Sequence, residues 1–198
     1  LGVRGRRPFF QQMQAGLIAF LAGTVVTALL AGTNLLTKDA IAQQTLLKEQ
    51  NSRKEVLPAA ETFDGVDTDG DGTADYYQGL DASGQAVGYV FITESKGYGG
   101  AIKVMTGITS DAQVSGVVLL EQEETPGLGA NATQESFRAQ YTGPVPEDGF
   151  TVLKNGGSTA DNEIDALTGA TISSKAVTDA VNQAVSAYQE LQAKGGAN

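Results

Sequence analysis

An uncharged stretch near the N-terminus divides the chain into a membrane-compatible segment and a longer acidic remainder. No Asp, Glu, Lys or Arg occurs from Pro8 to Thr37, and the most apolar part is Ala15–Ala31. A helix that crosses the hydrocarbon core of a bilayer needs about 20 apolar residues. The stretch therefore predicts a single N-terminal transmembrane helix, with residues 1–37 forming a short cytoplasmic end and the membrane anchor.

The charges that flank this stretch predict its orientation. Arg4, Arg6 and Arg7 precede it, and Lys and Arg are enriched on the cytoplasmic side of membrane helices. The rest of the chain would then lie on the extracytoplasmic side. The alternative is a cleaved signal peptide, because Ala40-Ile41-Ala42 resembles a cleavage site, but the apolar stretch is long for such a peptide.

The composition excludes several kinds of chemistry. The 198 residues contain no Cys and no His, which excludes thiolate nucleophiles, disulfides, zinc fingers, Cys-ligated clusters and Ser-His-Asp catalysis. The formal net charge of -10 is unfavourable for nucleic-acid binding, so we expect no nucleic-acid partner. Any redox reaction must therefore use an organic cofactor or a metal held by oxygen ligands.

The pattern after the anchor predicts an α+β domain. Helical spacing over residues 38–58 predicts a stalk helix that Pro58 ends, and residues 59–198 then form the domain. We expect strands at residues 84–93, 98–109, 113–122 and 149–154, a short helix at 133–141, and loops at 63–78 and 155–162. An apolar stripe that begins with Ile172 predicts a final helix over residues 172–192. Strands followed by a helix are typical of the α+β class.

The segment Asp165–Thr171 immediately precedes this final helix. The start of a helix presents unpaired N–H groups and the positive end of the helix dipole, which together stabilise a phosphate group. Gly169 would let the backbone approach such a group closely, and Thr171 would add a hydroxyl. The other interpretation of these residues is that Thr168 or Thr171 simply caps the helix.

Two motifs together resemble a known family. Asp165-Ala166-Leu167-Thr168-Gly169-Ala170-Thr171 is similar to the D-x-x-[ST]-G-A-T signature of an FMN-binding domain. This domain is shared by RnfG, of the Rnf electron-transport complex, and NqrC, of the sodium-pumping NADH:quinone oxidoreductase. The family's Glu-Thr-Pro-Gly-Leu-Gly loop occurs unchanged at Glu124–Gly129, and Tyr98–Ile102 resembles its glycine-rich strand entry. Thr168 and the run Ile172–Val177 resemble RnfG more closely than NqrC.

This resemblance implies a covalent flavin. In the family a flavin transferase joins FMN through its phosphate to the last Thr of the signature, which is Thr171 here. The resemblance also implies that Thr125, Leu128 and Gly129 line the isoalloxazine ring with Glu124 nearby. It implies that Thr168, Gly169 and Ala170 hold the phosphate end and that Asp165 is a further cofactor-binding residue. Lys154 matches the family only loosely and would make a polar contact to the flavin. The alternatives are an ordinary Pro-Gly turn at residues 124–129 and a solvated surface lysine at Lys154.

The family's role implies a function for the whole chain. By resemblance, it is an electron-carrying subunit of an ion-translocating ferredoxin:NAD⁺ oxidoreductase complex of Rnf type, in the inner membrane of a prokaryote. Its partners would be the other subunits of that complex, and it would have no turnover alone. One alternative is the FMN-domain subunit of a Na⁺-pumping NADH:quinone oxidoreductase.

The second alternative is a membrane-tethered calcium-binding interaction module. Asp67, Asp69, Asp71 and Asp75 have the spacing of an EF-hand calcium loop, with Gly72 at its sharp turn. Gln78 stands where such a loop has its bidentate Glu, which weakens the match. The segment is therefore either a structural Ca²⁺ site or an acidic, solvated turn.

Overall fold

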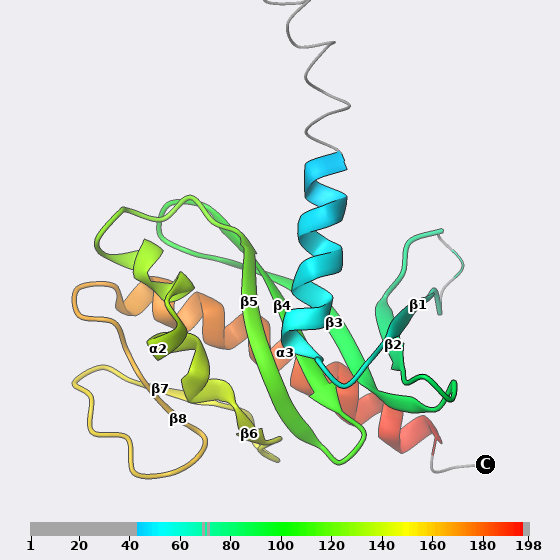
Figure 1. Ribbon diagram of the computed structural model, residues 1–198. Coiled ribbons are helices and arrows are strands. Elements are labelled where there is room, and N and C mark those ends of the chain that lie inside the picture. Colours follow the sequence, from blue (N-terminus) through cyan, green and yellow to red (C-terminus); the bar gives the residue numbers. More distant parts are fainter. Residues whose placement is uncertain (1–42, 69, 71, 196–198) are drawn as a thin grey trace, which may run out of the picture. The chain divides into compact units, whose positions relative to one another are not determined.

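The computed structural model describes residues 43–68, 70 and 72–195 (Figure 1). Residues 48–198 form one compact unit that is separate from the chain before it, and the fold below is that of this unit. The predicted anchor in residues 1–37 and the first residues of the predicted stalk lie outside the described residues. Within the described residues, no helix is both long and apolar enough to cross a membrane.

A six-stranded antiparallel sheet forms the centre of the unit. Its strands follow the order of the chain: β1 (Thr62–Val66), β2 (Tyr76–Leu80), β3 (Ala86–Lys96), β4 (Ala101–Thr109), β5 (Gln113–Glu121) and β6 (Gly143–Pro144). The central strand β4 is covered on both faces, and its sequence AIKVMTGIT is accordingly mostly apolar. The strands expected at residues 84–93, 98–109 and 113–122 are confirmed as β3, β4 and β5.

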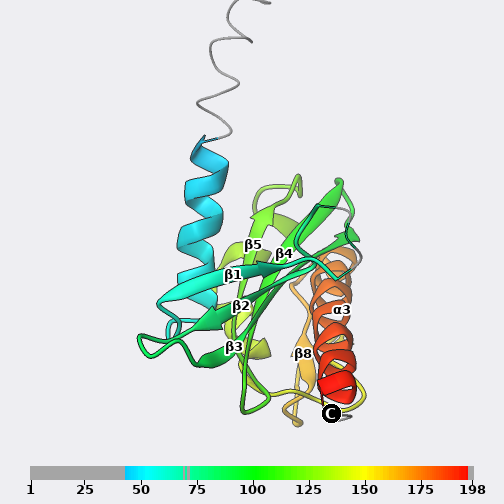
Figure 2. The same cartoon turned by 90° about the vertical axis from the view of Figure 1, so that its right-hand side faces the viewer.

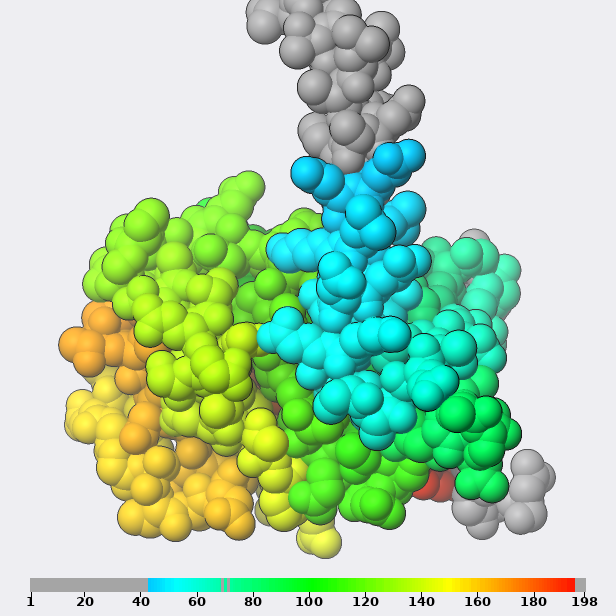
Figure 3. Space-filling view, in the orientation of Figure 1, coloured from blue at the N-terminus to red at the C-terminus, as the bar shows by residue number. Residues whose placement is uncertain are grey.

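Each face of the sheet is covered by a helix. On one face, α3 (Thr171–Gly195) packs its apolar stripe against Ile102, Val104 and Ile108 of β4 (Figure 2). On the other face lies the end of a helix over residues 43–56 (Figure 3). Its last turn ends at Val56, and Val56 and Leu57 are both fully buried. The predicted mixed-strand domain with a C-terminal helix is therefore confirmed, and its sheet has an apolar core on each side.

The loop predicted over residues 63–78 is too long, because its two ends belong to β1 and β2 and only the stretch between these strands is a loop. These strands pair antiparallel from Thr62 opposite Leu80 to Val66 opposite Tyr76. β1 is the edge strand and most of its side chains are exposed. An exposed edge strand does not need the apolar alternation by which strands are found in a sequence, so the pairing of β1 with β2 could not be predicted from such a pattern.

The segments that follow β5 are shorter and less regular than predicted. The helix expected at 133–141 is a four-residue helix α2 (Glu135–Arg138) between two 3₁₀ turns, η1 (Gly129–Thr133) and η2 (Ala139–Tyr141). The strand expected at 149–154 is β7 (Thr151–Leu153), which pairs in parallel with β8 (Glu163–Asp165). β8 was not predicted, since three residues are too few to show a period in the sequence.

Tyr141 joins η2 to the helix α3 that carries the candidate site. Its hydroxyl lies 2.7 Å from the Thr178 hydroxyl, and its ring meets Phe137 and Phe150 edge-on at 5.8 and 5.3 Å between centroids. Burial raises the pKa of Tyr141 well above its ordinary range, because the phenolate would lose its hydration. The pKa in the folded protein therefore exceeds the value of about 10 in the unfolded chain.

We expect this shift to make the protein sensitive to alkali. Below a pH of about 10, the contribution of the Tyr141 phenol to the free energy of unfolding is complete. As the pH rises above this value the contribution is lost, because this phenol ionises readily only in the unfolded chain. At neutral pH, Tyr141→Phe should lower the free energy of unfolding by about 1 kcal/mol, because the variant lacks this hydrogen bond. In urea unfolding at increasing pH, the variant should lose less stability than the native chain, and an equal loss in both would contradict the assignment.

Candidate functional site

A tight turn presents Thr171 at the first position of α3. The Ala170 N–H donates to the Leu167 carbonyl at 3.0 Å, and Gly169 has a φ of +74°, which residues with a side chain rarely adopt. The Ser174 hydroxyl secures the turn, because it accepts from the Leu167 N–H and donates to the Ala170 carbonyl, both at 3.0 Å. Thr171 is thus held half-buried at a helix start.

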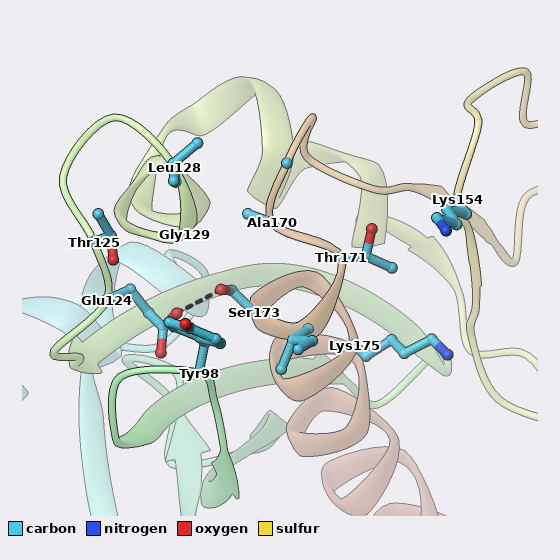
Figure 4. A pocket seen from close by; sticks show the side chains of 12 residues that line it. Tyr98, Glu124, Thr125, Leu128, Gly129, Lys154, Ala170, Thr171, Ser173 and Lys175 are labelled. Carbon is cyan, nitrogen blue, oxygen red and sulfur yellow. Dashed lines mark hydrogen bonds between the residues drawn. The ribbon is translucent and has the colours of Figure 1, made fainter.

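Thr171 lies in a cavity of about 750 Å³ (Figure 4). Its walls come from the turn before β4, from the segment between β5 and η1, from the segment after β7 and from the start of α3. The volume falls within the range of about 300–1,000 Å³ that is usual for small-molecule sites. The lining residues are Tyr98, Glu124, Thr125, Leu128, Gly129, Lys154, Gly169, Ala170, Thr171, Ile172, Ser173 and Lys175.

The cavity joins the two motifs that lie far apart in the sequence. Glu124, Thr125, Leu128 and Gly129 of the first motif line it together with Gly169, Ala170 and Thr171 of the second, and Lys154 completes the set. Two of the predicted residues, Asp165 and Thr168, do not line it. Thr168 is exposed in the turn before α3, and Asp165 lies in β8.

Asp165 supports the cavity wall from outside. It lies opposite Leu153, the residue before Lys154, in the β7–β8 register. Its carboxylate accepts the Ser158 N–H at 2.9 Å, which ties down the loop after Lys154. The Gln140 side chain in turn accepts the Asp165 N–H at 2.7 Å. Asp165 therefore positions the Lys154 segment and does not line the cavity itself.

The cavity has an apolar end and a cationic end. Within residues 48–68, 70 and 72–195, the exposed large hydrophobic side chains are Tyr98, Leu128 and Ile172, and all three line this one cavity. Exposed apolar side chains that gather at a pocket are typical of a ligand site. Near Thr171 the lining carries Lys154 and Lys175 (Figure 4). The arrangement suits a ligand with a flat apolar body and an anionic end.

Four lining residues were not predicted as site residues, namely Tyr98, Ile172, Ser173 and Lys175. Lys175 follows Thr171 by four positions, so both lie on the same helix face, and this spacing is visible in the sequence. Tyr98 lies in the glycine-rich run, for which the resemblance implies no role. The prediction that Ile172 belongs to the buried stripe of α3 is wrong, because its side chain is 55% exposed and lines the cavity.

Comparison with known proteins identifies the family of the chain. The FMN-binding domain family matches residues 97–186, a range that contains every residue lining the cavity. The G subunit of the Na⁺-translocating ferredoxin:NAD⁺ oxidoreductase complex of Acetobacterium woodii is 35% identical over 190 residues, which cover 89% of this chain and 91% of that protein. The chain belongs to the family of G subunits of ion-translocating oxidoreductase complexes.

A second relative supports the same family. The G subunit of the ion-translocating oxidoreductase complex of Methanosarcina acetivorans is 39% identical over 167 residues, which cover 81% of this chain and 86% of that protein. Among solved structures, NqrC of Shewanella oneidensis has a TM-score of 0.48 at 25% identity and covers 63% of this chain and 64% of that one. The two G subunits confirm the resemblance drawn from the two motifs.

The acidic loop of this family member is described only in part. Asp69 and Asp71 lie outside the described residues. The Asp67 carboxylate accepts the N–H groups of Gly70 and Gly72 at 2.7 and 2.8 Å. Hydrogen bonds from the Thr68 hydroxyl and N–H lower the pKa of Asp75. In the part of the chain that the structure describes, no group of three or more acidic residues is placed to hold a metal.

Calcium binding by this loop therefore stays a prediction. Oxygen ligands at alternate positions should give Ca²⁺ binding that is lost when Asp69→Asn and Asp71→Asn remove two carboxylates together. Calorimetric titration of the full chain measures this, with Mg²⁺ as the comparison ion because it requires tighter octahedral geometry. Absence of heat from Ca²⁺ with the native chain would contradict the prediction and leave an acidic, solvated turn.

Proposed function

We propose that this family member carries electrons in a membrane-bound ion-translocating oxidoreductase complex of Rnf type, through FMN bound covalently to Thr171. One observation carries the proposal: a single cavity has an apolar rim at one end and a helix start with two lysines at the other. FMN has the matching form, with a flat isoalloxazine ring at one end and a phosphate at the other.

The phosphate end of the proposed site combines three sources of positive potential. The first N–H groups of α3 have no acceptor within the helix, and the helix dipole is positive there. Lys154 and Lys175 line the same end of the cavity. A phosphoester on the Thr171 hydroxyl keeps a negative charge, which these groups stabilise. Lys175 lies one helical turn after Thr171, where its ammonium can reach that charge.

The ring end supplies contact surface. Tyr98 and Leu128 present large apolar side chains at this end, and Ile172 presents another beside Thr171; all three are otherwise left in water. An isoalloxazine ring that covered them would remove this exposed apolar area from water, which favours binding. Bound FMN supplies one- and two-electron chemistry that a chain without Cys or His lacks. The residues of the chain bind the cofactor, orient it and set the charge around it.

The relatives support the proposed complex and its partners. The similar chains are named as G subunits of complexes that move Na⁺, protons or ions, two of them with ferredoxin:NAD⁺ oxidoreductase in the name. These names favour the Rnf type over the quinone-reducing complex. The partners would be the other subunits of that complex and a flavin transferase during maturation. We expect no turnover from the isolated chain.

The proposed location rests on the N-terminal sequence. The uncharged residues 8–37 follow three arginines, which favours a single-pass anchor with the FMN-binding domain on the extracytoplasmic side of the inner membrane. Electrons would then be relayed on that side of the membrane.

Mass spectrometry tests the proposed cofactor directly. The full chain, co-expressed with a flavin transferase, should gain the mass of FMN less one water, and its denatured band should fluoresce under ultraviolet light. Co-purification from membranes should bring down the other subunits of the complex. A chain that gains no mass and shows no fluorescence under these conditions would refute the covalent flavin.

A further inference from the structure

Glu124 places a carboxylate inside the candidate cavity. The residue is only 6% exposed, yet it belongs to the cavity wall. Its Oε1 accepts the Gly99 N–H at 2.9 Å, and its Oε2 accepts the Ser173 hydroxyl at 2.5 Å (Figure 4). Both oxygens thus act as acceptors, which is the hydrogen-bonding pattern of an ionised carboxylate.

The fold makes room for this carboxylate with two glycines. A Cβ atom on Gly129 would lie 2.6 Å from Oε2 of Glu124, and one on Gly97 would overlap Oε1. Ser173, the hydroxyl donor, is itself 2% exposed in the first turn of α3. Three segments that are distant in the sequence therefore meet on one buried acidic group. A buried charge without such partners would be strongly destabilising, so its retention needs this arrangement.

Among the residues that the structure describes, no cation forms an ion pair with Glu124. The lysines of the cavity lie toward the other side, beyond Thr171 (Figure 4). Hydrogen bonds stabilise a carboxylate but leave its net charge in place. The cavity therefore contains a fixed negative charge at one end, in a low-dielectric setting where charges interact strongly.

We propose that Glu124 is an electrostatic determinant of the flavin's reduction potential. This inference rests on the proposed function, since it concerns FMN held in this cavity. Reduction adds electrons to the ring, and a fixed negative charge beside the ring opposes that addition. Glu124 therefore lowers the potential of the bound flavin. Ser173, two residues after Thr171, keeps the carboxylate in a constant position relative to the helix that carries the flavin.

Redox titration of flavin-loaded chains tests this inference. Glu124→Gln keeps the size of the side chain and removes the charge, so it should favour the reduced flavin about tenfold, which is about 30 mV for a two-electron couple. Glu123→Gln is the matched control, because this adjacent carboxylate is exposed and does not line the cavity. The control should leave the potential at the native value. The flavin content of each variant is measured by mass.

A second variant keeps the test decisive if Glu124→Gln folds poorly. Ser173→Ala retains the charge but removes a donor that partly offsets it, so the potential should shift in the opposite direction, below the native value. An unchanged potential in a fully loaded Glu124→Gln chain, or an equal shift in Glu123→Gln, would overturn this inference and leave the proposed function in place. A native chain without covalent flavin would overturn the proposed function and this inference with it.

Discussion

Replacing Thr171 with Val is expected to abolish covalent attachment of FMN. Val has nearly the shape of Thr but no hydroxyl, so no phosphoester can form at this position. The turn before α3 is held by Gly169 and by the Ser174 hydroxyl, neither of which the substitution removes. The variant should therefore fold, with a stability loss of about 1 kcal/mol or less from any lost helix-capping contribution.

Thr168→Val is the matched control for this substitution. Thr168 undergoes the same chemical change three residues earlier, but it is exposed and does not line the cavity. After co-expression with a flavin transferase, the control should gain the mass of FMN less one water and fluoresce on a denaturing gel. Fluorescence retained in Thr171→Val would assign the attachment to another residue, and fluorescence lost in Thr168→Val would show that attachment at Thr171 also needs the Thr168 hydroxyl of the signature.

Gly129→Ala is expected to have the second-largest effect, because it fills the space on which the cavity depends. The new Cβ would lie 2.9 Å from Cβ of Ser173 and 2.6 Å from Oε2 of Glu124. Ser173 cannot move away, since it is buried in the first turn of α3. Overpacking of this kind destabilises a protein by about 1–3 kcal/mol. The displaced carboxylate and loop should also lower the fraction of chains that carry FMN.

Urea unfolding and the ratio of flavin to protein measure these two effects. Gly100→Ala serves as the control, because the nearest atom to its added Cβ is Oε2 of Glu123 at 3.4 Å, an ordinary contact. We expect its stability to change by no more than about 0.5 kcal/mol. If Gly129→Ala matched the control in both measurements, the close packing of Gly129, Ser173 and Glu124 would have no energetic consequence.

Much of the candidate site could be predicted from the sequence because its parts are local. The turn that needs Gly169 and the helix that begins at Thr171 depend on neighbouring residues, and both appear in the structure as expected. The long apolar strands β3, β4 and β5 were also found, because a covered strand must carry a continuous or alternating apolar pattern. The absence of Cys and His restricted the redox chemistry without any structural information.

Other features could not be predicted, because they depend on which segments meet in space. The exposed edge strand β1 has no apolar pattern that distinguishes it from a loop, and only its pairing with β2 defines it. Ile172 fits the stripe of α3 by spacing, but its side chain is exposed and lines the cavity. Periodicity predicts the face of a helix and not what covers that face.

The sequence by itself therefore determined the class of domain, because this follows from residue types and short-range spacing. Its two motifs also carry the resemblance that implies the family and the hydroxyl proposed to bind the flavin. Only the tertiary structure decided that Ser173 donates to Glu124 across 49 positions of the chain, and that Asp165 supports the Lys154 segment from outside the cavity. Such contacts depend on strand register and on the packing of α3 against the sheet. These are properties of the whole fold, and no local pattern encodes them.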